Sequence, residues 1–500
     1  MHISSLPSPY GIGTFGKAAF EFADFLCSAG QKYWQMLPLS PSGFGDSPYQ
    51  SFSVFAGNPL FIDPELLIED SLLTKWEAQD FDCSGDSRYV DYGSLIQKRP
   101  FILRAAFSRG YSRYREEIEA FKSDNSHWLF DYALFMAVKS RFGMRSWQDW
   151  EDEAIKRREK DALGICLREL SEEIDYCVFC QYLFFKQWSR LKNYIASKGI
   201  SVIGDIPVYP ALDSADVWAH PELFALDRDF KPEFVAGVPP DYFSKTGQLW
   251  GNPLYDWERM GKNGFAWWME RIKGSRKIYD VIRLDHFRGL SEYWAVPFGE
   301  KTAENGEWKQ GPGKRFIDAL KAHFPELDVI AEDLGYMTEE VRGLLKYSGY
   351  PGMKVLQFAF DPKEPGDHLP HNLTKNTVLY TGTHDNETLK GFIKSSSDAT
   401  LRYIQEYLCV SRKEDIVWGI LRAGMSSVSD LFIAQMQDYL ELDNDSRMNT
   451  PSVPCGNWKW RMTSLKAASD LSGRIRRMTE LYGRLNDWGK SFETNQKSGR

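Results

Sequence analysis

Short apolar runs recur along the chain, each followed by polar residues and then by a longer stretch of helical periodicity. Residues 17–29 predict a helix, because apolar side chains recur there at intervals of three and four up to Gly30. Seven runs have the length and the bounding turn residues of strands. They span residues 33–37, 200–203, 281–284, 329–331, 353–358, 377–380 and 431–436.

The near-continuous apolar character of these runs indicates strands buried on both faces, as in a parallel sheet. The intervening stretches are long enough for crossover helices, so we predict an α/β fold. Polar residues follow the strands, at the end where a (β/α)8 TIM barrel keeps its active site, although an open doubly wound sheet would also place them there. No glycine-rich phosphate loop follows any run, which argues against nucleotide binding.

A barrel of this kind needs an eighth strand, and the start of the chain is the place to look for it. His2, Ile3 and Ser4 stand directly before the turn-rich residues 6–13, so a first strand would have almost no residues. The length of 500 residues fits two or three ordinary domains, or one barrel with insertions. Residues 94–198 are dominated by charged, helix-favouring segments and predict a helical insertion with solvated charged faces.

A long run of turn formers at residues 40–53 is either disordered or a binding loop. Its aromatic residues, Phe44, Tyr49 and Phe52, favour a binding loop. A second segment of this character covers residues 447–461, and we expect it to close the barrel at its mouth or at its base.

The segment 238–257 combines turn residues with aromatic side chains, and we interpret it as a lid or a stacking platform over a ligand. Packing of the rings between loop and barrel is the alternative, and it is the more credible interpretation for Tyr255 and Trp257. The aromatic residues of the segment are Tyr242, Phe243, Trp250, Tyr255 and Trp257.

Composition narrows the function without naming a reaction. Lys and Arg number 61 against 69 Asp and Glu, and no basic block stands out, so a nucleic acid is not an expected partner. The 17 Trp, 24 Tyr and 32 Phe either fill a large core or offer flat faces to a neutral ligand such as a sugar. Core packing is the safer interpretation of any one ring.

The cysteines and the apolar stretches bear on the cellular compartment. The seven cysteines are scattered, and Cys177 and Cys180 lie within a helical pattern, so we interpret this pair as core residues. No signal peptide is visible, and no stretch approaches the roughly 18–20 apolar residues of a membrane span. We therefore expect a cytoplasmic protein with no membrane partner and no obligate protein partner.

Three strand ends carry clustered polar side chains. The first holds Arg283 and Asp285, which point the same way because side chains alternate along a strand. The arginine would keep Asp285 ionised, which suits a nucleophile or an electrostatic stabiliser. The second holds Glu332 beside Asp333, where an apolar surrounding can raise the pKa of a carboxyl group, which suits a general acid. The third is the polar series at residues 383–387.

Any one of these sites alone is explained by an ion pair or a loop cap, but three at comparable strand ends indicate a function. Two carboxylates that flank a glycosidic bond are the minimum for glycoside chemistry, and a third could bind sugar hydroxyl groups. The residue types also fit a metal site. However, His286 and His384 are far apart in sequence and no compact ligand spacing occurs, so we expect neither a metal nor another cofactor.

Eight motifs follow one another along the chain, at residues 5–13, 46–53, 204–207, 239–257, 283–289, 331–335, 383–387 and 456–461. They resemble the 4-α-glucanotransferases, also called amylomaltases or disproportionating enzymes, of glycoside hydrolase family 77. The resemblance covers essentially the whole chain, and the longer motifs are specific. It implies one (β/α)8 barrel over residues 1–500 without a C-terminal β-sandwich. It also implies a mostly helical insertion at residues 60–195 and a loop-rich insertion at residues 207–280 that carries a glucan-covering lid.

The resemblance also implies a role for individual residues. Asp285 is the expected nucleophile, Glu332 the expected acid/base and Asp385 the expected stabiliser of the transition state. The implied reaction transfers a segment of an α-1,4-glucan, such as a maltooligosaccharide or amylose, to the 4-hydroxyl group of another glucan or of glucose, by retaining double displacement. Supporting roles are implied for Arg283, His384 and His286, and substrate binding for Tyr49, Trp250, Asn252, Asp205 and Asn386.

Three other functions stay open at this point. They are an α-glucan hydrolase with the same site, a glycan-binding module or inactive barrel, and a metal-dependent barrel hydrolase. Members of the family usually begin with an apolar first-strand segment before the Ser-Ser-Leu-Pro motif, which here begins at residue 4. We therefore expect the start of the chain to be truncated or misassigned.

Overall fold

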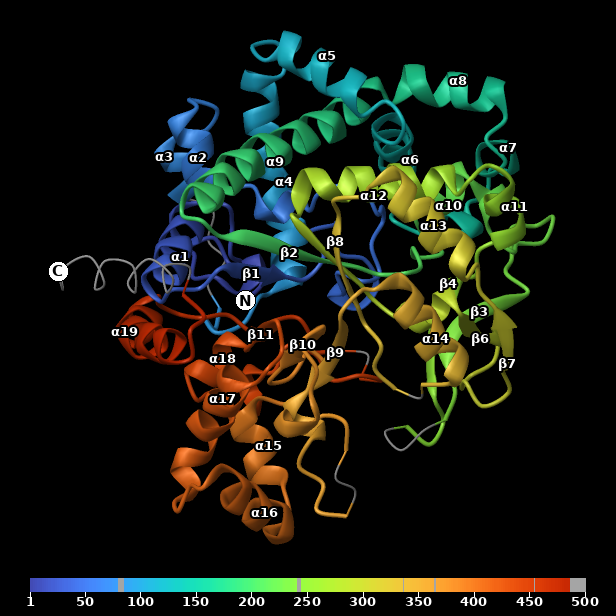
Figure 1. Cartoon of the computed structure of the whole chain (residues 1–500). Coiled ribbons are helices and arrows are strands. Elements are labelled where there is room, and N and C mark those ends of the chain that lie inside the picture. Colours follow the sequence, from blue (N-terminus) through green and yellow to red (C-terminus); the bar gives the residue numbers. More distant parts are fainter. Residues whose placement is uncertain (80–84, 241–243, 336, 364–365, 454, 486–500) are drawn as a thin grey trace, which may run out of the picture.

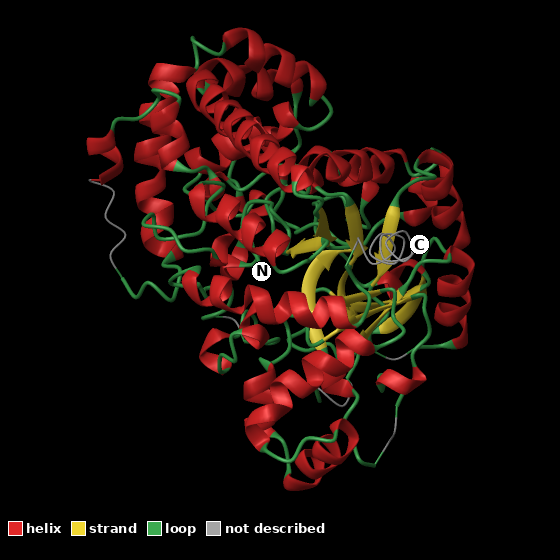
Figure 2. Ribbon diagram, turned by 60° about the vertical axis from the view of Figure 1, so that its left-hand side comes forward, coloured by secondary structure: helices red, strands yellow, loops and turns green. Residues whose placement is uncertain are grey.

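Parallel strands at the centre of the molecule form a nearly closed barrel (Figures 1 and 2). The computed structural model describes residues 1–79, 85–240, 244–335, 337–363, 366–453 and 455–485. In this part of the chain, seven strands pair in the order β1-β2-β5-β8-β9-β10-β11, and all neighbouring pairs are parallel, which confirms the predicted α/β barrel. They are β1 (Tyr33–Met36), β2 (Ser201–Ile206), β5 (Val281–Leu284), β8 (Asp328–Ala331), β9 (Gly352–Val355), β10 (Thr377–Tyr380) and β11 (Leu431–Ile433).

The eighth strand of a regular barrel is not formed within these described ranges. Ile3–Ser5 form a 3-10 helix instead, and all three residues are buried. The backbone N–H groups of Ser5 and Leu6 bond within this turn, so they are not available to a ladder. Met1 lies against β1, where its carbonyl oxygen accepts a hydrogen bond of 2.7 Å from the Trp34 indole.

A large helical layer lies between β1 and β2 in the sequence and covers one side of the barrel (Figure 1). Its longest helix, α9 (Ser171–Ser197), packs against α4 (Tyr92–Gly110), α5 (Arg115–Asp124) and α6 (Leu129–Arg141). The shorter helices of the layer are α2 (Pro64–Glu69), α3 (Lys75–Gln79), α7 (Glu153–Lys156) and α8 (Lys160–Glu169).

Further helices surround the remaining strands. The helix predicted at residues 17–29 is confirmed as α1 (Lys17–Ser28), and it packs against α9 and α19. The others are α10 (Ala215–Ala219), α11 (Trp257–Lys262), α12 (Ala266–Ile278), α13 (Lys314–His323), α14 (Glu339–Ser348), α15 (Leu389–Ser395), α16 (Asp398–Leu408), α17 (Ile416–Ser426), α18 (Met436–Tyr439) and α19 (Lys466–Leu481).

A second, antiparallel sheet stands beside the barrel, with the strand order β4-β3-β6-β7. Its strand β4 carries Trp250 and Asn252 of the predicted lid, whereas Tyr242 and Phe243 lie outside the described residues. The strands are β3 (Phe234–Val238), β4 (Gln248–Pro253), β6 (Glu292–Pro297) and β7 (Glu307–Gln310).

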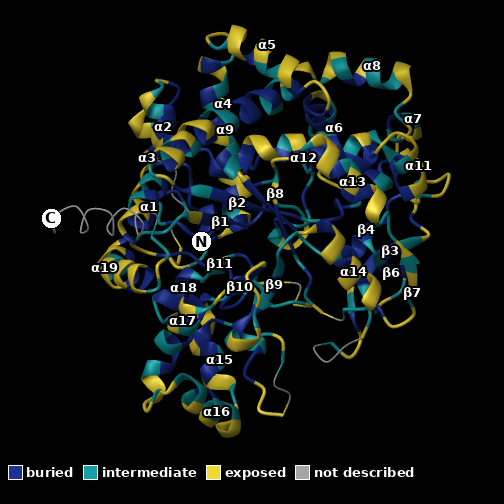
Figure 3. Ribbon diagram, in the orientation of Figure 1, coloured by how far each residue is buried: buried dark blue, intermediate teal, exposed yellow. Residues whose placement is uncertain are grey.

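Buried residues fill the centre of the molecule (Figure 3), and many aromatic side chains are among them. Tyr255 and Trp257 belong to the main core, at 2% and 6% exposure, which confirms the packing alternative for these two rings. Cys177 and Cys180 are free thiols on α9, and Cys180 is buried. No helix in the described ranges is long and apolar enough to cross a membrane.

Candidate active site

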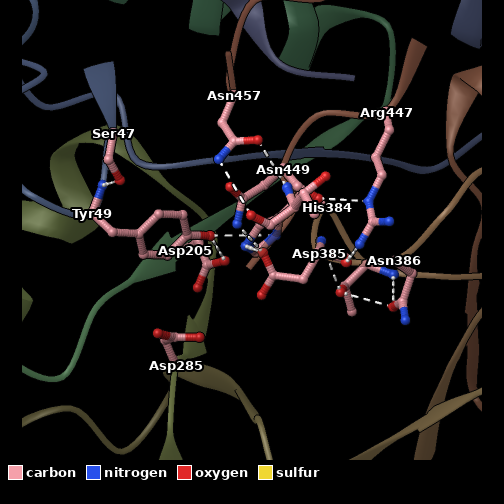
Figure 4. Close-up of polar contacts among 12 residues, drawn as sticks. Ser47, Tyr49, Asp205, Asp285, His384, Asp385, Asn386, Arg447, Asn449 and Asn457 are labelled. Carbon is pink, nitrogen blue, oxygen red and sulfur yellow. Dashed lines mark hydrogen bonds and ion pairs between the residues drawn. The ribbon is translucent and has the colours of Figure 1, made fainter. Parts of the chain in front are cut away.

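The polar side chains predicted at the strand ends meet at the carboxyl edge of the barrel, because parallel strands all end there. Asp205 lies near the end of β2, Asp285 directly follows β5, and His384 and Asp385 follow β10. Tyr49 reaches them from the loop after β1, and Figure 4 shows these side chains converging.

Arg283 is the buried cation of the site. Its Nη1 donates to both carboxylate oxygens of Asp205, at 2.7 and 2.6 Å, and to Asp285 Oδ1 at 2.9 Å. Asp205 is 2% exposed and also accepts a hydrogen bond of 2.8 Å from the Tyr49 hydroxyl group. Asp205 therefore holds Arg283 and Tyr49 in place, while its expected contact with substrate stays a prediction.

Asp285 and Glu332 are both half-buried, and different neighbours act on the pKa of each. Burial raises the pKa of Asp285 to about 6, and Arg283 is the strongest influence in the opposite direction. Burial raises the pKa of Glu332 to about 7, where the charge of Arg283 lowers it and that of Asp285 raises it. Glu332 thus keeps its proton to higher pH, as a general acid must, while Asp285 ionises first, as a nucleophile must.

Two backbone N–H groups hold the Glu332 carboxylate. His286 N donates to Oε2 and Leu334 N donates to Oε1, each at 2.8 Å. The adjacent Asp333 bonds to the backbone of the next strand instead: its buried carboxylate accepts a hydrogen bond of 2.5 Å from Met353 N on β9. Of these two neighbouring acidic residues, Glu332 is therefore the one that belongs to the site.

The third carboxylate, Asp385, is partly exposed and is held by side chains around it (Figure 4). The Asn449 amide donates to Oδ1 at 2.6 Å, and His384 Nε2 lies 3.3 Å from the same oxygen. The Arg447 guanidinium donates to the Asp385 backbone carbonyl at 2.5 Å.

The segment at residues 447–461 therefore reaches the mouth of the barrel, one of the two positions expected for it. Asn449 N donates to the His384 carbonyl at 3.0 Å, and Arg447 Nε donates to the Asn449 carbonyl at 2.7 Å. The Asn457 side chain accepts a bond of 2.9 Å from Thr450 N and fixes the turn that follows. Sequence reasoning did not select Asn449, because its partner Asp385 lies 64 residues earlier in the chain.

The rings of Tyr49 and His384 stack with 5.0 Å between centroids and 22° between planes. Trp458 tilts against both rings, with 5.6 Å between centroids in each case. The three rings bring together the loop after β1, the loop after β10 and the segment 447–461, so they fix the position of His384 beside Asp385.

Strand β4 of the predicted lid contacts the site through Trp250, whose ring meets the His286 imidazole edge-on with 4.8 Å between centroids. Asn252 is 6% exposed, donates to the Pro210 carbonyl at 2.8 Å and accepts from the Gln50 amide at 3.2 Å. Gln50 also donates to the Trp250 carbonyl at 3.3 Å. Asn252 therefore ties β4 to its neighbours, and its expected contact with substrate stays a prediction.

Asn386 is bonded within its own turn. Its Oδ1 accepts from the backbone N–H of Thr383 at 2.8 Å and from the Thr383 hydroxyl group at 3.0 Å. This pairing shapes the loop that presents His384 and Asp385, and substrate binding by Asn386 stays a prediction. Within the described ranges, no three His, Cys, Asp or Glu side chains are grouped so that they could hold a metal ion.

The arrangement offers a carboxylate beside a cation, a carboxyl group of higher pKa on the neighbouring strand, and a third carboxylate nearby. This set of groups can protonate the leaving oxygen of a glycosidic bond and attack its anomeric carbon. The third carboxylate can support the positive charge that develops on the sugar ring.

Comparisons with known proteins point in the same direction. The family model for 4-alpha-glucanotransferase matches residues 1–467. A 4-alpha-glucanotransferase of Clostridium butyricum is 46% identical over 97% of this chain and 100% of the relative. One from Aquifex aeolicus (strain VF5) is 46% identical over 97% of this chain and 98% of the relative. The solved structure of an amylomaltase from Streptococcus agalactiae in complex with acarbose matches with a TM-score of 0.95 and 42% identity, covering 97% of this chain and 99% of that one.

Proposed function

Because the chain belongs to the 4-α-glucanotransferase family, glycoside hydrolase family 77, we propose that Asp285, Glu332 and Asp385 carry a retaining double displacement on α-1,4-glucans. The protein is an enzyme of the 4-α-glucanotransferase type. The observation that supports these residue roles best is the pair of carboxyl groups at the ends of neighbouring strands, of which Asp285 contacts Arg283 at 2.9 Å while Glu332 is held by two backbone N–H groups.

In the first step, protonated Glu332 gives its proton to the glycosidic oxygen while a carboxylate oxygen of Asp285 attacks C1 of the sugar. The bond between C1 and the glycosidic oxygen breaks, and the leaving glucan departs with a new 4-hydroxyl group. A glycosyl ester of Asp285 remains. Arg283 orients the attacking carboxylate from 2.9 Å. A retaining reaction requires carboxyl groups about 5–5.5 Å apart, which stays a prediction for this pair.

In the second step, ionised Glu332 takes the proton from the 4-hydroxyl group of an acceptor sugar. The acceptor oxygen attacks C1, the new glycosidic bond forms and the Asp285 carboxylate is released. Between the two steps Glu332 carries a negative charge, and the N–H groups of His286 and Leu334 stabilise that charged form.

Asp385 supports the positive charge that develops on the sugar ring in both steps. The hydrogen bond from Asn449 and the adjacent His384 fix the orientation of the Asp385 carboxylate. Arg283 holds Asp285 and His384 lies beside Asp385, and neither of them transfers a proton in this scheme.

We propose maltooligosaccharides and amylose as donors and a glucan or glucose as acceptor. The amylomaltase from Streptococcus agalactiae was solved with acarbose bound, which supports an α-glucan site in this chain. Tyr49 and Trp250 offer partly buried rings at the site, and such rings favour sugar over water at the glycosyl ester. The expected cytoplasmic location stays a prediction.

Incubation with maltotriose tests this function. Transfer gives glucose and longer oligosaccharides while the number of reducing ends stays nearly constant. Hydrolysis raises the number of reducing ends in step with product, and that result would replace transfer by the hydrolase alternative. Asp285→Asn should abolish turnover and retain glucan binding; unchanged turnover in that variant would refute the assigned nucleophile.

A further inference from the structure

An extra residue interrupts the ladder between β5 and β8 at the catalytic edge. The register pairs Leu284 with Ala331, and Glu332 N donates to the Leu284 carbonyl at 3.0 Å. In a regular parallel ladder, the next bond would run from His286 N to the Glu332 carbonyl. Phe287 N makes that bond instead, at 3.0 Å. The His286 N–H is therefore released from the ladder, as in a β-bulge.

The backbone of His286 has the left-handed conformation that this bulge requires. Its φ of 52° and ψ of 49° are uncommon for a residue with a Cβ atom. The following turn helps to fix it, since Gly289 N donates to the His286 carbonyl at 2.9 Å. A Cβ atom on Gly289 would lie 3.0 Å from the imidazole, and Trp250 packs edge-on against the same ring at 4.8 Å. The surroundings thus hold His286 in a strained conformation.

The released N–H points at Glu332, with 2.8 Å between His286 N and Oε2. We propose that the bulge is a positioning device for the acid/base: the strained backbone of His286 aims an N–H group at the Glu332 carboxylate and sets both its orientation and its affinity for the proton. This inference rests on the role of Glu332 in the proposed function. Glu332 is the group that touches the reacting atoms, and His286 acts through it.

The effect on titration has a definite sign. A hydrogen bond from a backbone N–H stabilises the charged carboxylate, so its loss raises the pKa of Glu332. The charged and titratable groups that act on Glu332 are Arg283, Asp285 and Tyr380. Burial lowers the pKa of the His286 imidazole to about 4, so this ring is neutral near pH 7. Removing the N–H therefore changes none of the charges around Glu332.

The direct test removes only the N–H group. Incorporation of the α-hydroxy analogue of histidine at position 286 replaces the amide by an ester and keeps the imidazole. The readout is the pH profile of kcat/KM for maltotriose disproportionation, whose basic limb follows loss of the Glu332 proton. We expect that limb to move up by roughly one to two pH units, with a lower kcat. A basic limb that coincides with that of the wild type overturns the proposal.

Side-chain variants give the same test with ordinary protein. Glycine and asparagine tolerate the left-handed conformation, whereas valine resists it. His286→Gly and His286→Asn should therefore keep the wild-type basic limb, and His286→Val should move it toward that of the ester variant. An equal shift in all three variants overturns the proposal, because loss of the imidazole would then be the cause. If His286→Val does not fold, the ester variant decides alone.

Two controls separate this proposal from the function on which it rests. Absence of glucose release from maltotriose by the wild type would refute the proposed function itself. A basic limb that persists in Glu332→Gln would refute the role of Glu332. When both controls behave as expected, the ester variant reports on His286 alone.

Discussion

Asp205→Asn tests the buried charge network beneath the site. The carboxylate of Asp205 is fully buried and accepts hydrogen bonds from Arg283, at 2.7 and 2.6 Å, and from Tyr49, at 2.8 Å. Asparagine keeps the shape of the side chain but replaces one oxygen by an NH2 group. That group then faces the donors Arg283 or Tyr49, and Arg283 is left with Asp285 as its carboxylate partner in the network.

The expected cost follows from the contacts that remain. Removing one member of a buried ion pair costs about 3–5 kcal/mol in general. Arg283 keeps its bond of 2.9 Å to Asp285, so we expect the lower end, about 3 kcal/mol of unfolding free energy. Tyr49→Phe is the matched control, because it removes one bond to the same carboxylate and keeps the ring that stacks on His384. It should cost about 1.5–2 kcal/mol.

Urea unfolding and a pH profile together decide this prediction. The urea midpoint of Asp205→Asn should fall below that of Tyr49→Phe, with an unchanged slope of free energy against urea. The charge of Asp205 raises the pKa of Asp285, so the substitution lowers that pKa. Asp285 must be charged to attack, so the acid limb of kcat/KM should move to lower pH. A wild-type midpoint, or an acid limb that moves to higher pH, refutes the reasoning.

Three further predictions concern groups at the site. The wild-type pH profile of kcat/KM for maltotriose should be bell-shaped, with limbs near pH 6 and pH 7, because Asp285 must be charged and Glu332 protonated. Glu332→Gln should lose the basic limb, and a basic limb that remains in this variant would refute the assignment of Glu332. Asn449→Asp places a second carboxylate beside Asp385, so kcat at pH 7 should fall by roughly 100-fold and should recover in part as the pH is lowered. A fall in kcat that does not depend on pH would contradict this electrostatic cause. Gln50→Ala removes the hydrogen bonds from the Tyr49 loop to β4, so a larger share of turnovers should end in hydrolysis. The measurement is the number of reducing ends formed per glucose released, and an unchanged ratio would contradict a role for this contact in transfer.

The strand ends that carry the site could be predicted because their signal is local. A buried parallel strand is a short apolar run, and polar residues directly after it must lie at the carboxyl edge. Arg283, Asp285, Glu332 and the loop after β10 were located in this way. The ends of the strands were harder to predict from the sequence. The apolar run at residues 353–358 was predicted as one strand, but the structure ends β9 at Val355 and continues with a 3-10 helix at Leu356–Phe358.

What the sequence did not reveal depends on contacts between distant segments. Asp205 and Asn252 fit the pattern of substrate-binding residues, yet their polar groups are bonded to Arg283, Tyr49, Gln50 and Pro210. The aromatic excess likewise suggested sugar-facing rings, whereas many of these rings fill the core. The residue type at a position, polar or aromatic, does not reveal which residues the fold places next to it.

The different roles of the two half-buried carboxyl groups, Asp285 and Glu332, follow from the position of Arg283. Arg283 contacts Asp205 and Asp285, so its one positive charge already faces two carboxylates. Ionisation of Glu332 would add a further negative charge near Asp285, and this cost is opposed by Arg283, which is already shared by two carboxylates, and by the N–H groups of His286 and Leu334. The proton therefore stays on Glu332 until a leaving oxygen takes it. Once Asp285 is esterified, its negative charge is gone, and Glu332 can hold its own charge until an acceptor supplies the next proton.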